Sequence, residues 1–126
     1  MSQSRWVDQT IHHDPDKQQY GNCMQACIAS LLNLPLDEVP HFHHDGCDAP
    51  TFWERIEDFL GSKGFAMSYG MMHDCLNVTT GPTKRGTTHC VITHKGELKH
   101  DPHPSRSGLI ENDHSFHLVP YDPALK

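Results

Sequence analysis

The chain has 126 residues, the length of one globular domain, and a formal net charge of −6 at pH 7 with histidine counted as neutral. It has no run of lysine and arginine, no apolar stretch near the ~20 residues that span a bilayer, and no signal-peptide core, so we expect neither a nucleic-acid partner nor a membrane. Twelve histidines and five cysteines supply candidate bases, nucleophiles and metal ligands, and the odd number of cysteines favours reduced thiols.

The first third of the chain predicts one helix after a polar, irregular stretch over residues 1–20. Small and apolar side chains recur at helical spacing over residues 23–32, with Asn22 as a candidate N-cap and Pro35 beyond the end. A further helical turn is expected at residues 36–39, and the histidine-rich residues 41–50 are expected to form a loop.

A second helix is predicted after this loop. Its apolar face comprises Phe52, Ile56, Phe59 and Leu60. Asp48 or Thr51 is a suitable N-cap, and Pro50 suits the first turn. Gly61 and Gly64 predict its end.

The second half of the chain predicts a sheet. Residues 65–72 alternate as a strand does, and the Thr-Gly-Pro-Thr run at residues 80–83 predicts a loop. Residues 89–94 and 97–101 flank Lys95-Gly96 and predict a β-hairpin, and residues 116–121 predict a final strand. Because no repeat or linker interrupts the chain, we expect a single α+β domain over residues 1–126.

Three chemically suitable side chains fall at the ends of these elements. Cys23 begins the first helix, where exposed N–H groups and the helix dipole favour a thiolate. His89 begins a strand, and Asp101 ends the partner strand of the same hairpin, so the two are approximate cross-strand neighbours. A nucleophilic thiol, a base, and an acceptor that orients the base form a catalytic triad.

The sequence around these residues resembles the papain-like cysteine peptidases. The run Gln-Gln-Tyr-Gly-Asn-Cys-Met-Gln-Ala-Cys-Ile-Ala-Ser-Leu-Leu, then His89-Cys-Val-Ile and Asp101-Pro, is similar in order and spacing to the peptidases that remove double-glycine leader peptides during bacteriocin export. The Leu-Pro-Leu-Asp-Glu-Val-Pro-His-Phe segment also resembles small bacterial and phage-borne proteins of this kind. The resemblance covers about 40 residues in two blocks, and Met24 departs from the glycine of that family.

This resemblance implies a fold, a mechanism and a location. It implies a papain-like domain in which the helix of the nucleophile Cys23 packs on a small antiparallel sheet. It also implies a glutamine that stabilises the oxyanion, for which Gln18 is favoured over Gln19. The cytoplasm of a bacterium, or of the host cell if a phage encodes the chain, is the implied location.

Several residues remain as alternatives or as further parts of the site. Cys27 is the rival nucleophile but is expected in the core, His94 and His100 are rival bases, and Asp113 is a rival for Asp101. The cluster over residues 41–47 has neither Cys-x-x-Cys nor His-Glu-x-x-His spacing, so we expect no metal and no other cofactor. We instead assign substrate binding to His41, His43, His44 and Asn22.

The sequence thus predicts a cysteine peptidase or amidase that cleaves a peptide, isopeptide or related amide bond in a peptide or protein through a Cys23 thioester. A transglutaminase- or acyltransferase-like enzyme with the same triad is one alternative. A non-catalytic module that binds a metal or a partner through histidine and cysteine is the other.

Overall fold

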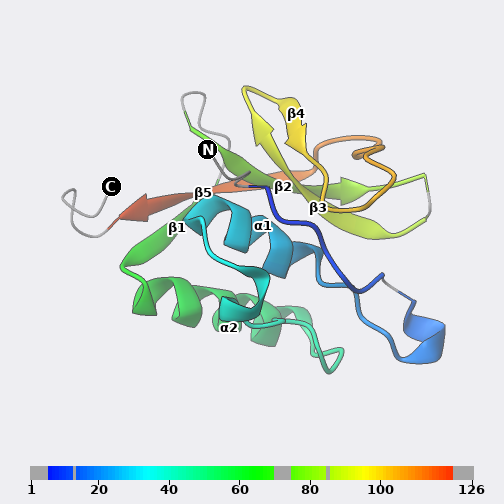
Figure 1. Ribbon diagram of the computed structural model, residues 1–126, viewed down its shortest axis with the longest axis horizontal. Helices are drawn as coiled ribbons and strands as arrows, with labels where there is room; N and C mark the ends of the chain where they lie inside the picture. Colours follow the sequence, from blue (N-terminus) through cyan, green and yellow to red (C-terminus); the bar gives the residue numbers. More distant parts are fainter. Residues whose placement is uncertain (1–5, 13, 70–74, 85, 121–126) are drawn as a thin grey trace.

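The computed structural model describes residues 6–12, 14–69, 75–84 and 86–120. They form an α+β fold with one antiparallel sheet, in agreement with the predicted class (Figure 1). The strands lie in the order β1-β5-β2-β3-β4. The elements are η1 (Pro15–Lys17), α1 (Cys23–Leu32), η2 (Leu36–Glu38), α2 (Ala49–Ser62), β1 (Phe65–Tyr69), β2 (Asn77–Pro82), β3 (Thr88–His94), β4 (Glu97–His100) and β5 (His114–Pro120).

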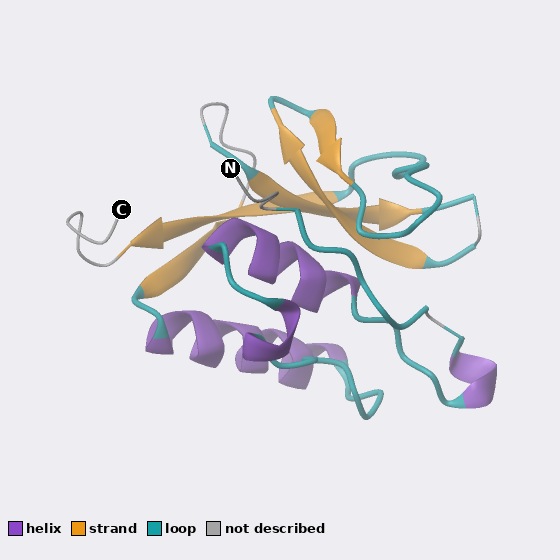
Figure 2. Ribbon diagram, in the orientation of Figure 1, coloured by secondary structure: helices purple, strands orange, loops and turns teal. Residues whose placement is uncertain are grey.

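Both α-helices lie on the same side of the sheet (Figure 2). Helix α1 packs against β3 and α2 packs against β1, so the core lies between the helices and one face of the sheet. Its fully buried members include Ile28, Ile56, Leu60, Val78 and Ile92. Burying each such side chain contributes roughly 1.5–3 kcal/mol. No helix among the described residues is both long and apolar enough to cross a membrane.

Helix α1 has the predicted bounds. Asn22 is its N-cap residue, but the Asn22 side chain makes no capping hydrogen bond, which corrects the expectation that it would. The helix ends at Asn33, whose left-handed backbone (φ 58°) lets its N–H reach the carbonyls of Ala29 and Ser30. The chain therefore leaves the helix two residues before Pro35.

Helix α2 follows the predicted pattern at its start. The Asp48 side chain caps it by accepting a hydrogen bond from the Thr51 N–H at 2.9 Å. The helix continues through Gly61 to Ser62, and Gly64, with φ 90°, leads into β1. The expected strand over residues 65–72 is observed as Phe65–Tyr69, and its last three residues lie outside the described part of the chain.

The predicted hairpin is confirmed as β3 and β4. Lys95 and Gly96 both have positive φ, at 55° and 79°, as a two-residue hairpin turn of the favoured hand requires. The ladder shifts register between Ile92 and Thr93, so that Ile92 pairs with His100. The final strand β5 begins at His114, and Tyr121 lies outside the described residues.

The loop predicted at residues 80–83 is wrong for its first three residues, because residues 77–82 form β2 between β5 and β3. Gly81 permits this, since a Cβ there would collide with the carbonyl oxygen of Glu111. The close approach lets the segment before β5 bond to β2, from Ile110 N–H to the Pro82 carbonyl (2.7 Å) and from Asp113 N–H to the Thr80 carbonyl (2.8 Å).

Candidate active site

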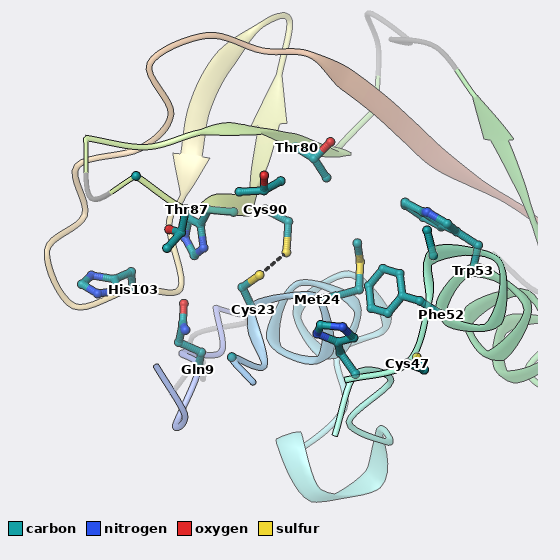
Figure 3. A pocket seen from close by; sticks show the side chains of 16 residues that line it. Gln9, Cys23, Met24, Cys47, Phe52, Trp53, Thr80, Thr87, Cys90 and His103 are labelled. Atoms are coloured by element: carbon teal, nitrogen blue, oxygen red, sulfur yellow. Dashed lines mark hydrogen bonds between the residues drawn. The ribbon is translucent and has the colours of Figure 1, made fainter. Parts of the chain in front are cut away.

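Cys23 lies at the first residue of α1 and borders a cavity of about 540 Å³. The wall on one side is mostly apolar and includes Met24, Phe52 and Trp53, while Gln9 and His103 lie on the other side (Figure 3). His89 and Cys90, from the start of β3, complete the part of the cavity nearest to the thiol. Because α1 packs against β3, the helix end and the strand end meet here.

His89 and Asp101 form a buried pair, as the hairpin predicted. His89 Nε2–H donates to Asp101 Oδ1 at 2.7 Å, and the two residues are only 5% and 1% exposed. Asp101 directly follows the last ladder position of β4, where His100 pairs with Ile92. The Asp101 carboxylate also accepts hydrogen bonds from the backbone N–H groups of His103 (2.9 Å) and Gly108 (2.8 Å), which hold it in place.

The electrostatics of this pair favour an imidazolium beside a carboxylate. Burial acts to lower the pKa of His89, but Asp101 and the Cys23 sulfur outweigh it and raise that pKa to about 9. Burial acts to raise the pKa of Asp101, yet the hydrogen bonds from His89, His103 and Gly108 hold it at about 2. His89 therefore carries a proton at neutral pH.

The Cys23 thiol has two partners on β3, the Cys90 thiol and the His89 ring. The Cys90 thiol donates to Cys23 Sγ at an S···S distance of 2.7 Å (Figure 3). This hydrogen bond, together with the nearby His89 ring, holds the pKa of Cys23 well below its usual value although burial opposes the shift. Burial raises the pKa of Cys90 well above its usual value. Cys23 is therefore the thiolate of this pair and Cys90 the donor.

The structure does not bring the predicted oxyanion glutamine to this cavity. Gln18 is exposed in a turn with φ 56° and does not line the cavity. Gln19 is also exposed and donates its side-chain N–H to the His12 carbonyl at 2.6 Å.

The glutamine that does line the cavity is Gln9, which the sequence reasoning missed. Gln9 is 8% exposed and donates one side-chain N–H to the Ile11 carbonyl at 2.8 Å. Its backbone N–H donates to the Pro102 carbonyl at 3.1 Å, beside Asp101. Gln9 is fourteen positions before Cys23, so no local spacing could reveal it.

Of the four residues assigned to substrate binding, only His43 lines the cavity. His41 Nε2–H donates to the Tyr20 carbonyl at 2.8 Å. His44 is exposed and does not line the cavity. Asn22 is 2% exposed, and its Oδ1 accepts from the backbone N–H groups of Thr10 (3.0 Å) and Ile11 (2.8 Å). Through these hydrogen bonds Asn22 holds the segment before α1 in place.

The rival residues occupy other places. Cys27 is fully buried in the core, where burial raises its pKa. His100 Nε2–H donates to the Val7 carbonyl at 3.0 Å, and neither His94 nor Asp113 lines the cavity. Among the described residues no group of three or more His, Cys, Asp and Glu side chains has a geometry that could hold a metal ion.

Comparison with known proteins returned no match from the protein-family models, the curated proteins or the solved structures.

Proposed function

We propose that this chain is a cysteine peptidase or amidase with a papain-like fold, which cleaves a peptide, isopeptide or related amide bond. The observation that carries the proposal is the meeting of three groups at one cavity: the Cys23 thiol, the His89 ring and the Asp101 carboxylate behind it. Acyl transfer needs this set, a nucleophile beside a base that a third group orients. The local resemblance to the double-glycine leader peptidases supports the same chemistry.

The first step is acylation of Cys23. Because His89 Nε2 is bonded to Asp101, Nδ1 is the ring nitrogen left to face the thiol. The thiolate of Cys23 attacks the carbonyl carbon of the scissile amide, the C–N bond breaks, and His89 gives its proton to the leaving amine. A raised pKa of about 9 keeps that proton available at neutral pH.

The oxyanion of the tetrahedral intermediate needs donors close to Cys23. The Cys23 backbone N–H, at the first position of α1, has no partner within the helix. We propose Gln9 in place of Gln18 as the side-chain donor, because Ile11 takes only one of its two N–H groups. One such donor contributes roughly 10²–10³ in rate.

Hydrolysis completes the cycle. Neutral His89 removes a proton from water, the resulting hydroxide attacks the thioester, and Cys23 leaves as the thiolate. If an amine replaces water, the same steps make a new amide, which is the transferase alternative. Incubation with a peptide substrate and a primary amine, followed by mass spectrometry of the products, separates hydrolysis from transfer.

Covalent labelling tests the proposal. We expect an iodoacetamide- or vinyl-sulfone-type probe at neutral pH to label the wild type at one thiol, and Cys23→Ala to abolish the labelling. Cys27→Ala and Cys47→Ala should retain it, since Cys27 is buried and Cys47, although at the cavity, contacts neither His89 nor Asp101.

The base has its own control. His89→Ala should lower the labelling rate while His94→Ala leaves it unchanged, because His94 lies at the far end of β3. Equal labelling of Cys23→Ala and the wild type would overturn the assignment of the nucleophile.

A further inference from the structure

A second thiol touches the Cys23 thiol, and the mechanism above does not use it as a reactant. Cys90 Sγ lies 2.7 Å from Cys23 Sγ, and both residues border the cavity. Figure 3 shows the two sulfur atoms directed toward each other, Cys23 from α1 and Cys90 from β3. Cys90 is only 2% exposed, so its sulfur is reached from solvent through the cavity.

Both thiols are on regular elements packed against each other. Cys23 opens α1, and Cys90 lies within β3, where it pairs with Thr80 of β2. The contact is therefore held by the helix–sheet packing and not by a loop. No large movement of the backbone is needed to bring the sulfur atoms together.

The other cysteines are less suitable partners. Cys27 is fully buried and does not border the cavity, so an oxidant cannot reach it there. Cys47 borders the cavity, but its thiol points to the Phe42 carbonyl, 3.6 Å away. Cys75 lies just before β2, outside the cavity lining.

We propose that Cys23 and Cys90 form a site of reversible oxidative modification, at which a peroxide converts the two thiols to an intramolecular disulfide. The Cys23 thiolate attacks the peroxide oxygen that bears a hydrogen, the O–O bond breaks, and the other oxygen leaves as an alcohol or water with the proton of His89. Cys23 is then a sulfenic acid. Cys90 attacks its sulfur, the S–O bond breaks, and the departing hydroxide leaves as water with the Cys90 proton. The two thiols lose two electrons and two protons, and the peroxide is reduced.

The disulfide has two consequences. It occupies the sulfur that would attack the substrate, so oxidation stops acyl transfer, and this part rests on the proposed function. It also consumes the sulfenic acid before a second peroxide can oxidise it to the irreversible sulfinic acid. Thiol–disulfide exchange with a dithiol then restores both cysteines.

The test is peroxide treatment of the purified wild-type protein, followed by peptide mapping without reduction. We expect a cross-linked pair of peptides that contains Cys23 and Cys90, and loss of probe labelling at Cys23 that dithiothreitol reverses. A map with Cys23 joined to Cys27, to Cys47 or to another molecule, or with oxygen adducts alone, would overturn the proposal.

Two variants sharpen the test. Cys90→Ala should form no cross-link to Cys23, and its Cys23 should gain oxygen atoms that dithiothreitol fails to remove. Cys47→Ala, the matched variant of a cavity thiol without a sulfur contact, should behave as the wild type does. If Cys90→Ala fails to fold, the wild-type map still decides. A mapped Cys23–Cys90 cross-link in a protein that cleaves no amide would leave this proposal standing and refute the proposed function alone.

Discussion

The hydrogen bond between His89 Nε2 and Asp101 Oδ1 determines which nitrogen of the imidazole faces the thiol. Asp101 is itself fastened by the N–H groups of His103 and Gly108, so the ring has little freedom to rotate. A buried carboxylate with three donors remains ionised at neutral pH, as its pKa of about 2 requires. The charge of Asp101 therefore acts directly on the His89 ring.

Replacing this carboxylate should change the titration of the ring. In Asp101→Asn the pKa of His89 should fall well below about 9, because the Cys23 thiolate is then the one negative charge beside the ring that opposes the effect of burial. The rate of amide cleavage should fall by roughly 10²–10⁴-fold. Titration of the His89 ring protons by NMR checks the first expectation. An unchanged His89 pKa in Asp101→Asn would contradict the assigned ion pair.

The same shifts set the pH range over which the pair stabilises the fold. His89 has a folded pKa above its ordinary 6.5, so its contribution is complete below about 6.5 and disappears as the pH rises through about 9. Asp101 has a folded pKa below its ordinary 3.8, so its contribution is complete above about 3.8 and disappears as the pH falls through about 2. The pair thus contributes most to the free energy of unfolding between about pH 3.8 and about pH 6.5.

At the scale of elements, local signals identified α1, α2 and the β3–β4 hairpin. The Asp48 cap and the Lys95-Gly96 turn each involve residues close together in the chain, so the local sequence is enough to predict them. Strand β2 was missed because Gly81 and Pro82 are usual in loops. Its strand conformation depends on the segment before β5, about thirty residues later, and no local pattern reports that contact.

Strand β2 supplies a prediction at this scale. Gly81→Ala keeps an ordinary backbone conformation but directs a methyl group at the Glu111 carbonyl oxygen. We expect a loss of about 1–3 kcal/mol in the free energy of unfolding, since backbone must move to make room. Faster hydrogen exchange at the Ile110 and Asp113 amides, which bond to β2, should accompany it. If both amides exchange in Gly81→Ala at the rate of the wild type, the Glu111 carbonyl does not lie as close to Gly81 as the structure has it.

At the scale of the whole molecule, the segment over residues 6–11 connects α1, which begins at Cys23, to the end of β4, which Asp101 follows. Its Val7 N–H donates to Ser30 of α1, and its Val7 carbonyl accepts from His100 of β4. Figure 1 shows this segment in dark blue beside α1. Neither Gln9 nor this arrangement could be read from the sequence, because the contacts join residues about twenty to ninety positions apart.

Asn22 is the residue that fastens this segment to the start of α1. In Asn22→Ala the N–H groups of Thr10 and Ile11 lose the acceptor that the buried Asn22 side chain supplies, so we expect the free energy of unfolding to fall by ~1–3 kcal/mol in chemical denaturation. The rate of amide cleavage should fall as well, since Ile11 holds Gln9, the proposed oxyanion donor. Thr10→Val is the matched control, because Asn22 Oδ1 still accepts from both N–H groups and only the hydrogen bond that Asn22 donates to Thr10 Oγ1 is lost. Thr10→Val should therefore cost less than Asn22→Ala on both measurements. Equal losses for the two variants would mean that the fastening depends on the donated hydrogen bonds instead.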